Sequence, residues 1–378
     1  MKKRVVVISI LTTLLTSITM AEESALPKDW ESKYSFFGFA QVGASLGDGA
    51  NLGDDANIAF NADRIRLGWK YFSGALAGKV FLDFTQDGKG NIEVPNIIKD
   101  AFIAYKFDGS AIVKVGILKT PVGMGFTTGG WNLDVVKRGF DKKLAFERAM
   151  GIMVSGRDIG FDNNGKVNGL EVGHERPWKG FGYDMMITGA TGRSGAVVSP
   201  DDIKKAGNGF MGRLMFDWTQ LVHVEASYGV TPNADGNTTG NSPDYKVLNI
   251  GLDSHFDKAN IKAEYYDVEN IRGVAGWDMS TVALTGTYAV NNKVELAIKD
   301  IRGKESIGGV ESDAINTYLG VNYYLNPKND KMDRKSRKAR NRHRVQLNYV
   351  ASDVDDDFKG VGSLYKDDTI LMQYQFKF

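Results

Sequence analysis

Seven basic side chains lie between residues 119 and 157, where only three acidic side chains accompany them. The whole chain has a formal net charge of only +1, so this stretch holds a local excess of positive charge. Arginine offers a rigid fork of N–H donors that matches phosphate oxygens, and lysine acts as a mobile point charge. The residue types therefore indicate an anion-binding segment, with the candidates Lys119, Lys137, Arg138, Lys142, Lys143, Arg148 and Arg157.

The same stretch interrupts the alternating pattern that governs most of the chain. We predict that residues 119–167 form one long loop, although 147–155 could be an additional strand. A loop of this length in a compact fold is usually functional or disordered. We expect it to fold into the interior of a barrel and to set what passes.

Elsewhere, apolar and polar residues alternate with a period of two, which is typical of strands with two different faces. In the final segment, Ile370, Met372 and Tyr374 share one face, and Gln373 and Gln375 share the other. We predict sixteen such strands, at residues 34–46, 58–72, 74–86, 97–108, 110–118, 168–175, 181–191, 208–218, 220–230, 245–256, 259–270, 277–289, 292–302, 312–325, 341–352 and 367–378.

Short and long connections alternate between these strands. Most strands have the length that a tilted membrane-spanning strand requires. An even number of strands with short turns on one rim and long loops on the other is typical of a transmembrane β-barrel. Lipid offers no hydrogen bonds, so only a closed barrel satisfies every backbone group there. We predict an all-β, antiparallel barrel that forms one domain over residues 34–378; a soluble β-sandwich is the alternative.

The N-terminus has the features of a secretory signal peptide over residues 1–21, with a basic head, a short apolar core and small residues before a cleavage site after Ala21. A linker at 22–33 follows. The chain has no cysteine and no later apolar run long enough for a spanning helix. These features predict a bacterial outer-membrane protein, whose C-terminal signal for the barrel-assembly machinery would be Tyr374, Phe376 and Phe378.

The polar faces of the predicted strands carry more basic than acidic residues. A basic surplus in a narrow aqueous bore focuses positive potential and favours anions. Alternatively, these charges pair with one another and only keep the channel wet. The strand candidates are Arg64, Arg66, Lys79, Lys114, Arg342 and Arg344.

Catalysis, metal binding and nucleic-acid binding find little support. The four histidines are scattered without metal-ligand spacing, and the near-neutral charge implies no general attraction to nucleic acid. Residues 162–171 match only the later part of an EF-hand loop, because Gly160 stands at the first ligand position. We therefore expect no enzyme activity, no metal and no cofactor.

Several motifs, in order along the chain, resemble the phosphate-selective porin O/P family: Lys99–Tyr105 (KDAFIAY), Gly116–Gly123 (GILKTPVG), Gly156–Gly160 (GRDIG), Tyr318–Pro327 (YLGVNYYLNP) and Val345–Val350 (VQLNYV). The resemblance implies a sixteen-stranded homotrimeric channel with an inward third loop. It assigns Arg64 and Arg66 to a basic pair on the second strand, and Arg148 and Arg157 to loop arginines. The basic insertion Lys328–Arg340 departs from the family pattern and is most simply a solvated turn.

Together these observations predict a porin for passive diffusion of small anions, with phosphate or polyphosphate favoured. Its surroundings would be outer-membrane lipid and lipopolysaccharide. Two alternatives stay open: a general diffusion porin with weak anion preference, and a structural or adhesive surface barrel plugged by its own loop.

Overall fold

The computed structural model describes residues 32–47, 58–85, 97–107, 111–161, 179–189, 207–218, 221–232, 243–325, 342–361 and 364–378. The predicted signal peptide, almost all of the linker, the EF-hand-like stretch 162–171 and the insertion 328–340 lie outside these ranges. In the part of the chain that is described, no helix is long and apolar enough to cross a membrane.

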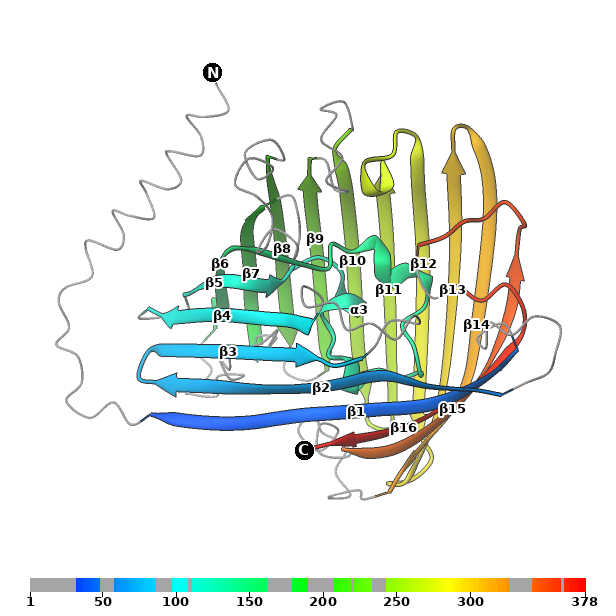
Figure 1. Cartoon of the computed structure of the whole chain (residues 1–378), viewed down its shortest axis with the longest axis horizontal. Coiled ribbons are helices and arrows are strands. Elements are labelled where there is room, and N and C mark those ends of the chain that lie inside the picture. Colours follow the sequence, from blue (N-terminus) through cyan, green and yellow to red (C-terminus); the bar gives the residue numbers. More distant parts are fainter. Residues whose placement is uncertain are drawn as a thin grey trace.

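Sixteen antiparallel strands in the described ranges form one closed barrel, in which each strand pairs with its neighbours in sequence and β1 pairs with β16 (Figure 1). The predicted barrel is confirmed. The strands are β1 (Lys33–Gly47), β2 (Ala59–Ser73), β3 (Leu76–Asp83), β4 (Ile98–Lys106), β5 (Ile112–Lys119), β6 (Arg148–Ile159), β7 (Lys179–Gly189), β8 (Asn208–Trp218), β9 (Val222–Thr231), β10 (Tyr245–Phe256), β11 (Ala259–Glu269), β12 (Trp277–Ala289), β13 (Val294–Ile307), β14 (Val310–Tyr324), β15 (His343–Val354) and β16 (Thr369–Lys377).

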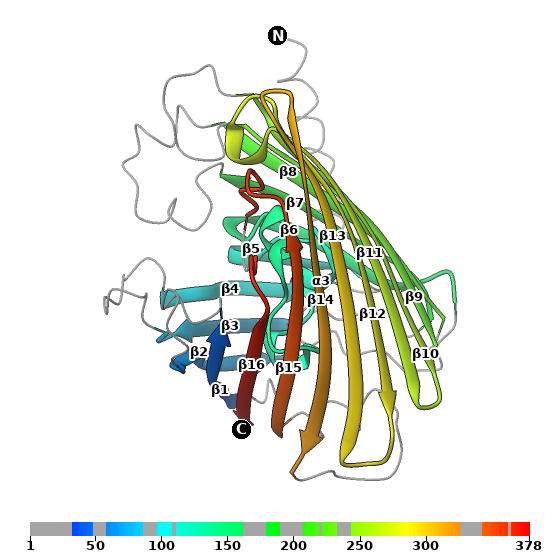
Figure 2. The ribbon, with the colours of Figure 1, turned by 90° about the vertical axis from the view of Figure 1, so that its right-hand side faces the viewer.

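The two walls of the barrel differ in strand length and direction. Figure 1 shows β1–β5 running across the view and β9–β13 running nearly at right angles to them, and Figure 2 shows the long strands strongly tilted. Such crossing is what opposite walls of a barrel with tilted strands display. β3 and β5 have 8 residues each, whereas β13 has 14 and β14 has 15, so the wall made by β3–β5 is low.

Alternation along each strand separates an apolar outer face from an inner face. In β10, Leu248 and Ile250 are exposed, while Val247, Asn249 and Asp253 are buried. The exposed apolar side chains are those that lipid would cover, because lipid removes them from water without requiring hydrogen bonds. The inner face therefore holds the side chains that meet the lumen.

The prediction that residues 119–167 form one loop before the sixth strand is wrong, and the alternative that residues 147–155 form a strand is confirmed. The sixth strand is β6 at Arg148–Ile159, while the predicted run 168–175 lies outside the described residues. The inner side chains at the start of β6 include Ala149 and Met153, which are buried in an apolar cluster. The polar half of the alternation is thus missing, so the pattern resembled a loop. The connection that follows β5 ends at Glu147 rather than at residue 167, and Arg148 and Arg157 belong to a strand.

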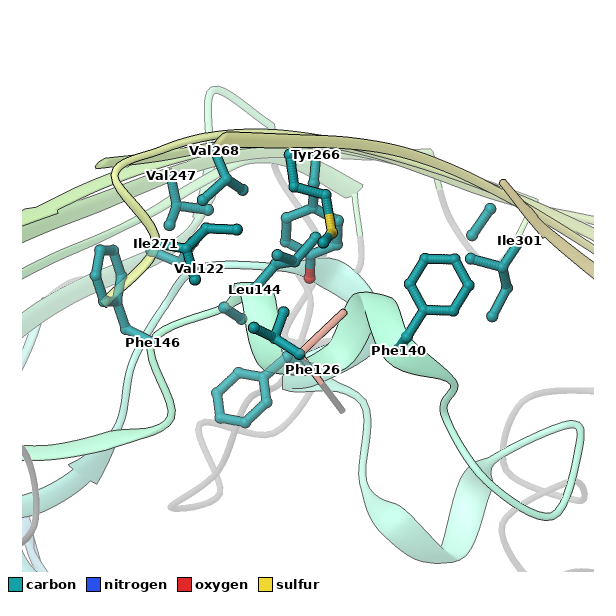
Figure 3. Packing of buried hydrophobic residues seen from close by; sticks show 14 of the residues in the cluster. Val122, Phe126, Phe140, Leu144, Phe146, Val247, Tyr266, Val268, Ile271 and Ile301 are labelled. Atoms are coloured by element: carbon teal, nitrogen blue, oxygen red, sulfur yellow. The ribbon is translucent and has the colours of Figure 1, made fainter. Parts of the chain in front are cut away.

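The alternating pattern predicts a polar inner face, but the observed inner face is apolar in part. Figure 3 shows Val247, Val268, Tyr266 and Ile301 on the inner wall packed against side chains of the connection between β5 and β6. Apolar residues at these inner positions are buried by that connection instead of meeting water, which stabilises its attachment to the wall. The inner wall is therefore apolar where the connection covers it.

The C-terminus closes the barrel against β1. Gly38 and Phe378 exchange two backbone hydrogen bonds at 3.1 and 3.3 Å. A Cβ atom at Gly38 would lie 2.7 Å from the backbone oxygen of Arg66 on β2, so this close approach requires glycine. The rings of Phe376 and Tyr374 are exposed on the outer face.

Candidate functional site

The connection between β5 and β6, residues 120–147, lies against the inner wall of the barrel; we call it the lumen loop. It contains the short helix α3 (Met124–Thr127) and the 3-10 helices η2 (Gly130–Asn132) and η3 (Phe140–Leu144). Its backbone exchanges hydrogen bonds with inward side chains of strands far away in sequence, among them Gln41, Ser227, Asn249, Glu264, Asn322, Asn348 and Gln375. The lumen loop therefore contacts the inner wall from β9–β15 as far as β1.

Among the described residues, no carboxylate forms an ion pair with Arg64 on β2 or with Arg138 on the lumen loop. Arg64 Nη1 donates to Gln41 Oε1 at 2.5 Å, and Arg138 donates to the backbone oxygens of Gly125 and Thr128. Burial lowers the pKa of Arg138 well below its usual value, and the positive charges of Arg64, Arg66 and Arg148 lower that pKa further.

Arg66, Lys79 and Arg148 also lie on the inner face, but each is paired with an acid. Asp83 accepts from Arg66 at 2.9 Å and from Lys99 at 3.2 Å. Asp100 accepts from Lys79 at 2.5 Å and from Arg148 at 2.8 Å. Each carboxylate thus serves two cations, which leaves the wall of β2–β6 with a positive excess.

A β-bulge places an acid that we had not predicted in this region. The pairing of β1 with β2 shifts by one residue between Gln41 and Val42, so Asp63 is left without a partner opposite. Its carboxylate accepts from Gln373 at 2.6 Å and lies 3.6 Å from Lys137 of the lumen loop. Strict period-two counting could not find Asp63, because a bulge turns the strand by one position.

The other basic residues of the lumen loop have different surroundings. Lys142 pairs with Glu147 at 3.1 Å, and Lys143 is exposed. Burial lowers the pKa of Lys142 to about 8, against the opposing effect of the charge of Glu147. The ammonium of Lys119, at the end of β5, lies 4.5 Å from the centre of the Phe126 ring.

A pocket that is open to solvent lies between the lumen loop and the inner faces of β11–β13. Lys262 of β11 pairs with Asp134, and Lys299 of β13 lies 3.5 Å from Asp141. The charged lining contains five basic and three acidic residues: Lys137, Arg138, Lys142, Lys262 and Lys299, with Asp134, Asp141 and Glu264. The structure thus brings three of the predicted loop candidates to one pocket.

Arg157 does not join this group. It lies on β6, where it pairs with Asp184 at 2.8 Å, and Arg213 pairs with the same carboxylate at 2.5 Å. All three side chains are at least 95% buried. Arg213 also contacts Glu225, so the positive charge of Arg157 is neutralised in a buried network of the wall. We assign Arg157 to the wall structure.

The remaining strand candidates are spread over the barrel. Lys114 of β5 is buried on the inner face. Arg344 of β15 is buried and lies 3.5 Å from the side-chain oxygen of Gln375. Arg342 is exposed in the turn before β15 and does not line the strand wall.

The family model described as phosphate-selective porin O and P matches residues 41–265 of this chain. The match includes β2–β10 and the whole lumen loop. No curated protein matches the chain.

Several solved porins share the fold. An anion-selective porin from Comamonas acidovorans is 13% identical and has a TM-score of 0.60; the match covers 92% of this chain and 100% of that chain. The trimer form of OmpT from Vibrio cholerae is 13% identical, with a TM-score of 0.58 and coverage of 92% and 99%. OmpF from Salmonella typhi, in complex with daunomycin, is 15% identical, with a TM-score of 0.59 and coverage of 92% and 98%.

Proposed function

Because the chain belongs to the family of phosphate-selective porins O and P and is an outer-membrane channel that prefers anions, we propose that phosphate and related oxyanions are the favoured permeants of this channel. The lumen loop would form the constriction. Arg64 and Arg138 would contact the anion directly, with Arg66, Arg148 and Lys142 supplying the surrounding positive potential.

The observation that carries this proposal is the positive charge of Arg64 and Arg138, which no described carboxylate neutralises. A guanidinium offers several N–H donors, and the hydrogen bonds that these two make to neutral oxygens leave further donors for an oxyanion. Burial is the main cause of the lowered pKa of Arg138, and the nearby positive charges of Arg64, Arg66 and Arg148 lower that pKa further. An anion between the wall and the lumen loop would relieve this repulsion.

Planar-bilayer recording tests the proposal. A chloride current that phosphate blocks with saturation supports a binding site for phosphate. A current that stays linear and does not respond to phosphate would overturn the phosphate preference. Permeation also requires sites weak enough to release the ion, so we expect block at high micromolar to millimolar phosphate rather than tight binding.

A general diffusion porin with weak anion preference is the second candidate. The sharing of Asp83 and Asp100 among four basic residues favours it, because paired charges bind a passing anion poorly. The same recording distinguishes the two candidates, since a general porin would conduct phosphate and chloride without mutual block.

We also propose a homotrimer, which is supported by the trimer form of the similar porin OmpT. The low wall of β3–β5, with exposed Ile103 and Val115, would be its contact surface. Cross-linking in native membranes would show a band at three times the monomer mass, and a single monomer band would contradict the proposal.

The chain ends support a proposal about its route to the outer membrane. Cleavage after Ala21 would release the signal peptide. The exposed rings of Tyr374 and Phe376, followed by Phe378, would be read by the barrel-assembly machinery. N-terminal sequencing of the mature protein checks the cleavage site, and deletion of Phe378 should lower the amount of assembled barrel.

A further inference from the structure

The connection between β15 and β16 lies on the same rim as the lumen loop, and its first half enters the barrel. We call residues 355–361 the mouth segment. Phe358 and Val361 are 0% and 2% exposed, whereas Asp355, Asp356 and Lys359 are exposed. The mouth segment therefore directs apolar side chains inward and charged ones outward.

Glu305 of β13 anchors the mouth segment by its backbone. The carboxylate accepts from the N–H of Lys359 at 2.7 Å and from that of Gly360 at 3.2 Å. It also accepts from the indole N–H of Trp277 at 2.7 Å. Hydrogen bonds to an ionised carboxylate are among the stronger ones, and Glu305 is buried, so the segment is held at a defined position.

From this position Phe358 reaches the lumen loop. Its ring meets that of Phe140 edge to face, with ring centres 5.6 Å apart. Both rings lie over Gly303 of β13, where a Cβ atom would be 2.7 Å from Phe140 and 3.3 Å from Phe358. Both phenylalanines are completely buried, although they are 218 positions apart in the chain. The absence of a side chain at Gly303 makes room for this contact.

Phe140 is the first residue of η3, which also holds the charged residues Asp141, Lys142 and Lys143. Any displacement of Phe140 therefore moves Asp141 and Lys142, two residues that line the pocket. We propose that Phe358 is a positioning residue for selectivity, which fixes the end of the lumen loop that carries Asp141 and Lys142. The proposal rests on the proposed role of the lumen loop as the constriction.

The test is Phe358→Ala in the full-length protein, recorded in planar bilayers. We expect at least about a twofold rise in open-channel current noise and a change of similar size in the chloride-to-potassium permeability ratio, because a loosened loop moves the charges that set the potential. Phe358→Leu, which keeps an apolar contact, should restore most of both properties. Phe140→Ala should act like Phe358→Ala, and the double variant should add little to either single one.

Lys359→Ala is the matched control, because it removes an exposed side chain from the same segment but keeps the N–H that binds Glu305. Noise recorded in about 1 M KCl, where the screening length is about 3 Å, excludes a simple effect of charge at the rim. In samples that are not heated before gel electrophoresis, a folded barrel migrates differently from the unfolded chain, and this difference shows that each variant is assembled. If Phe358→Ala does not assemble, Phe140→Ala, which removes the other ring of the same contact, is recorded in its place.

The outcomes separate the two proposals. An assembled Phe358→Ala or, failing that, an assembled Phe140→Ala with wild-type noise and selectivity overturns the role of Phe358. Neutralising Lys142 provides the comparison. If Lys142→Gln changes selectivity and Phe358→Ala does not, only the positioning role fails. If neither variant has an effect, this part of the lumen loop does not form the constriction, and the positioning role of Phe358 fails together with the role proposed for Lys142.

Discussion

Arg64 is held in the lumen by Gln41, whose side-chain oxygen accepts from the guanidinium at 2.5 Å. Two residues further along β2, Arg66 is paired with Asp83. Two arginines on one face of the same strand thus differ in their partners: Arg64 donates to a neutral side chain, and Arg66 shares the carboxylate of Asp83 with Lys99.

This difference predicts unequal effects of Arg64→Gln and Arg66→Gln. A hydrogen bond to a charged group contributes about 1.5–3 kcal/mol, so loss of a direct contact should weaken phosphate block by roughly tenfold or more. Arg66→Gln should have a smaller effect, since Asp83 remains paired with Lys99. Titration of the chloride current with phosphate measures both. Equal weakening in the two variants would show that only the total charge matters.

Lys142 gives the channel a pH dependence. Burial lowers the pKa of its ammonium to about 8. The group is charged below that pKa and neutral above it, so anion preference should fall as the pH rises from about 7 to about 9. Reversal potentials at several pH values measure this, and Lys142→Arg, which stays charged, should weaken the dependence over that interval. If the dependence is unchanged in Lys142→Arg, another group is responsible.

Asp184 should matter for stability. Its carboxylate holds both Arg157 and Arg213 in the buried wall. Asp184→Asn leaves two buried cations without their shared partner, and breaking a buried pair costs about 3–5 kcal/mol. We expect the temperature at which the barrel unfolds on gels to fall clearly. Arg157→Gln should leave phosphate block unchanged in the assembled protein; a loss of block would restore Arg157 as an anion ligand.

The sequence predicts most of the barrel, because lipid on one side and water on the other impose alternation on each strand. Thr369–Lys377 shows this well, with Leu371, Gln373 and Gln375 buried and Ile370 and Met372 exposed. β6 was predicted only as an alternative, over residues 147–155, for a physical reason: where the lumen loop covers the wall, the inner residues Ala149 and Met153 are apolar. The alternation vanishes wherever the lumen is filled by protein.

The site was predictable only in its residue types. Three of the basic residues between 119 and 157, Lys137, Arg138 and Lys142, line one pocket, but the pairing of each residue depends on distances across the barrel. Arg157 meets Asp184 on the next strand, and Lys137 meets Asp63, which a bulge turns inward. Phe358 gave no signal at all, because its contact with Phe140 joins two connections that only barrel closure brings together.

The most direct test of the account is the reversal potential of the purified protein in a bilayer with about a tenfold KCl gradient at pH 7, where Lys142 is charged. The positive excess of the lumen predicts a potential that reports chloride permeating faster than potassium. A potential that reports potassium permeating faster would contradict anion preference, and with it the assignment of Arg64 and Arg138 as the residues that meet the permeating ion.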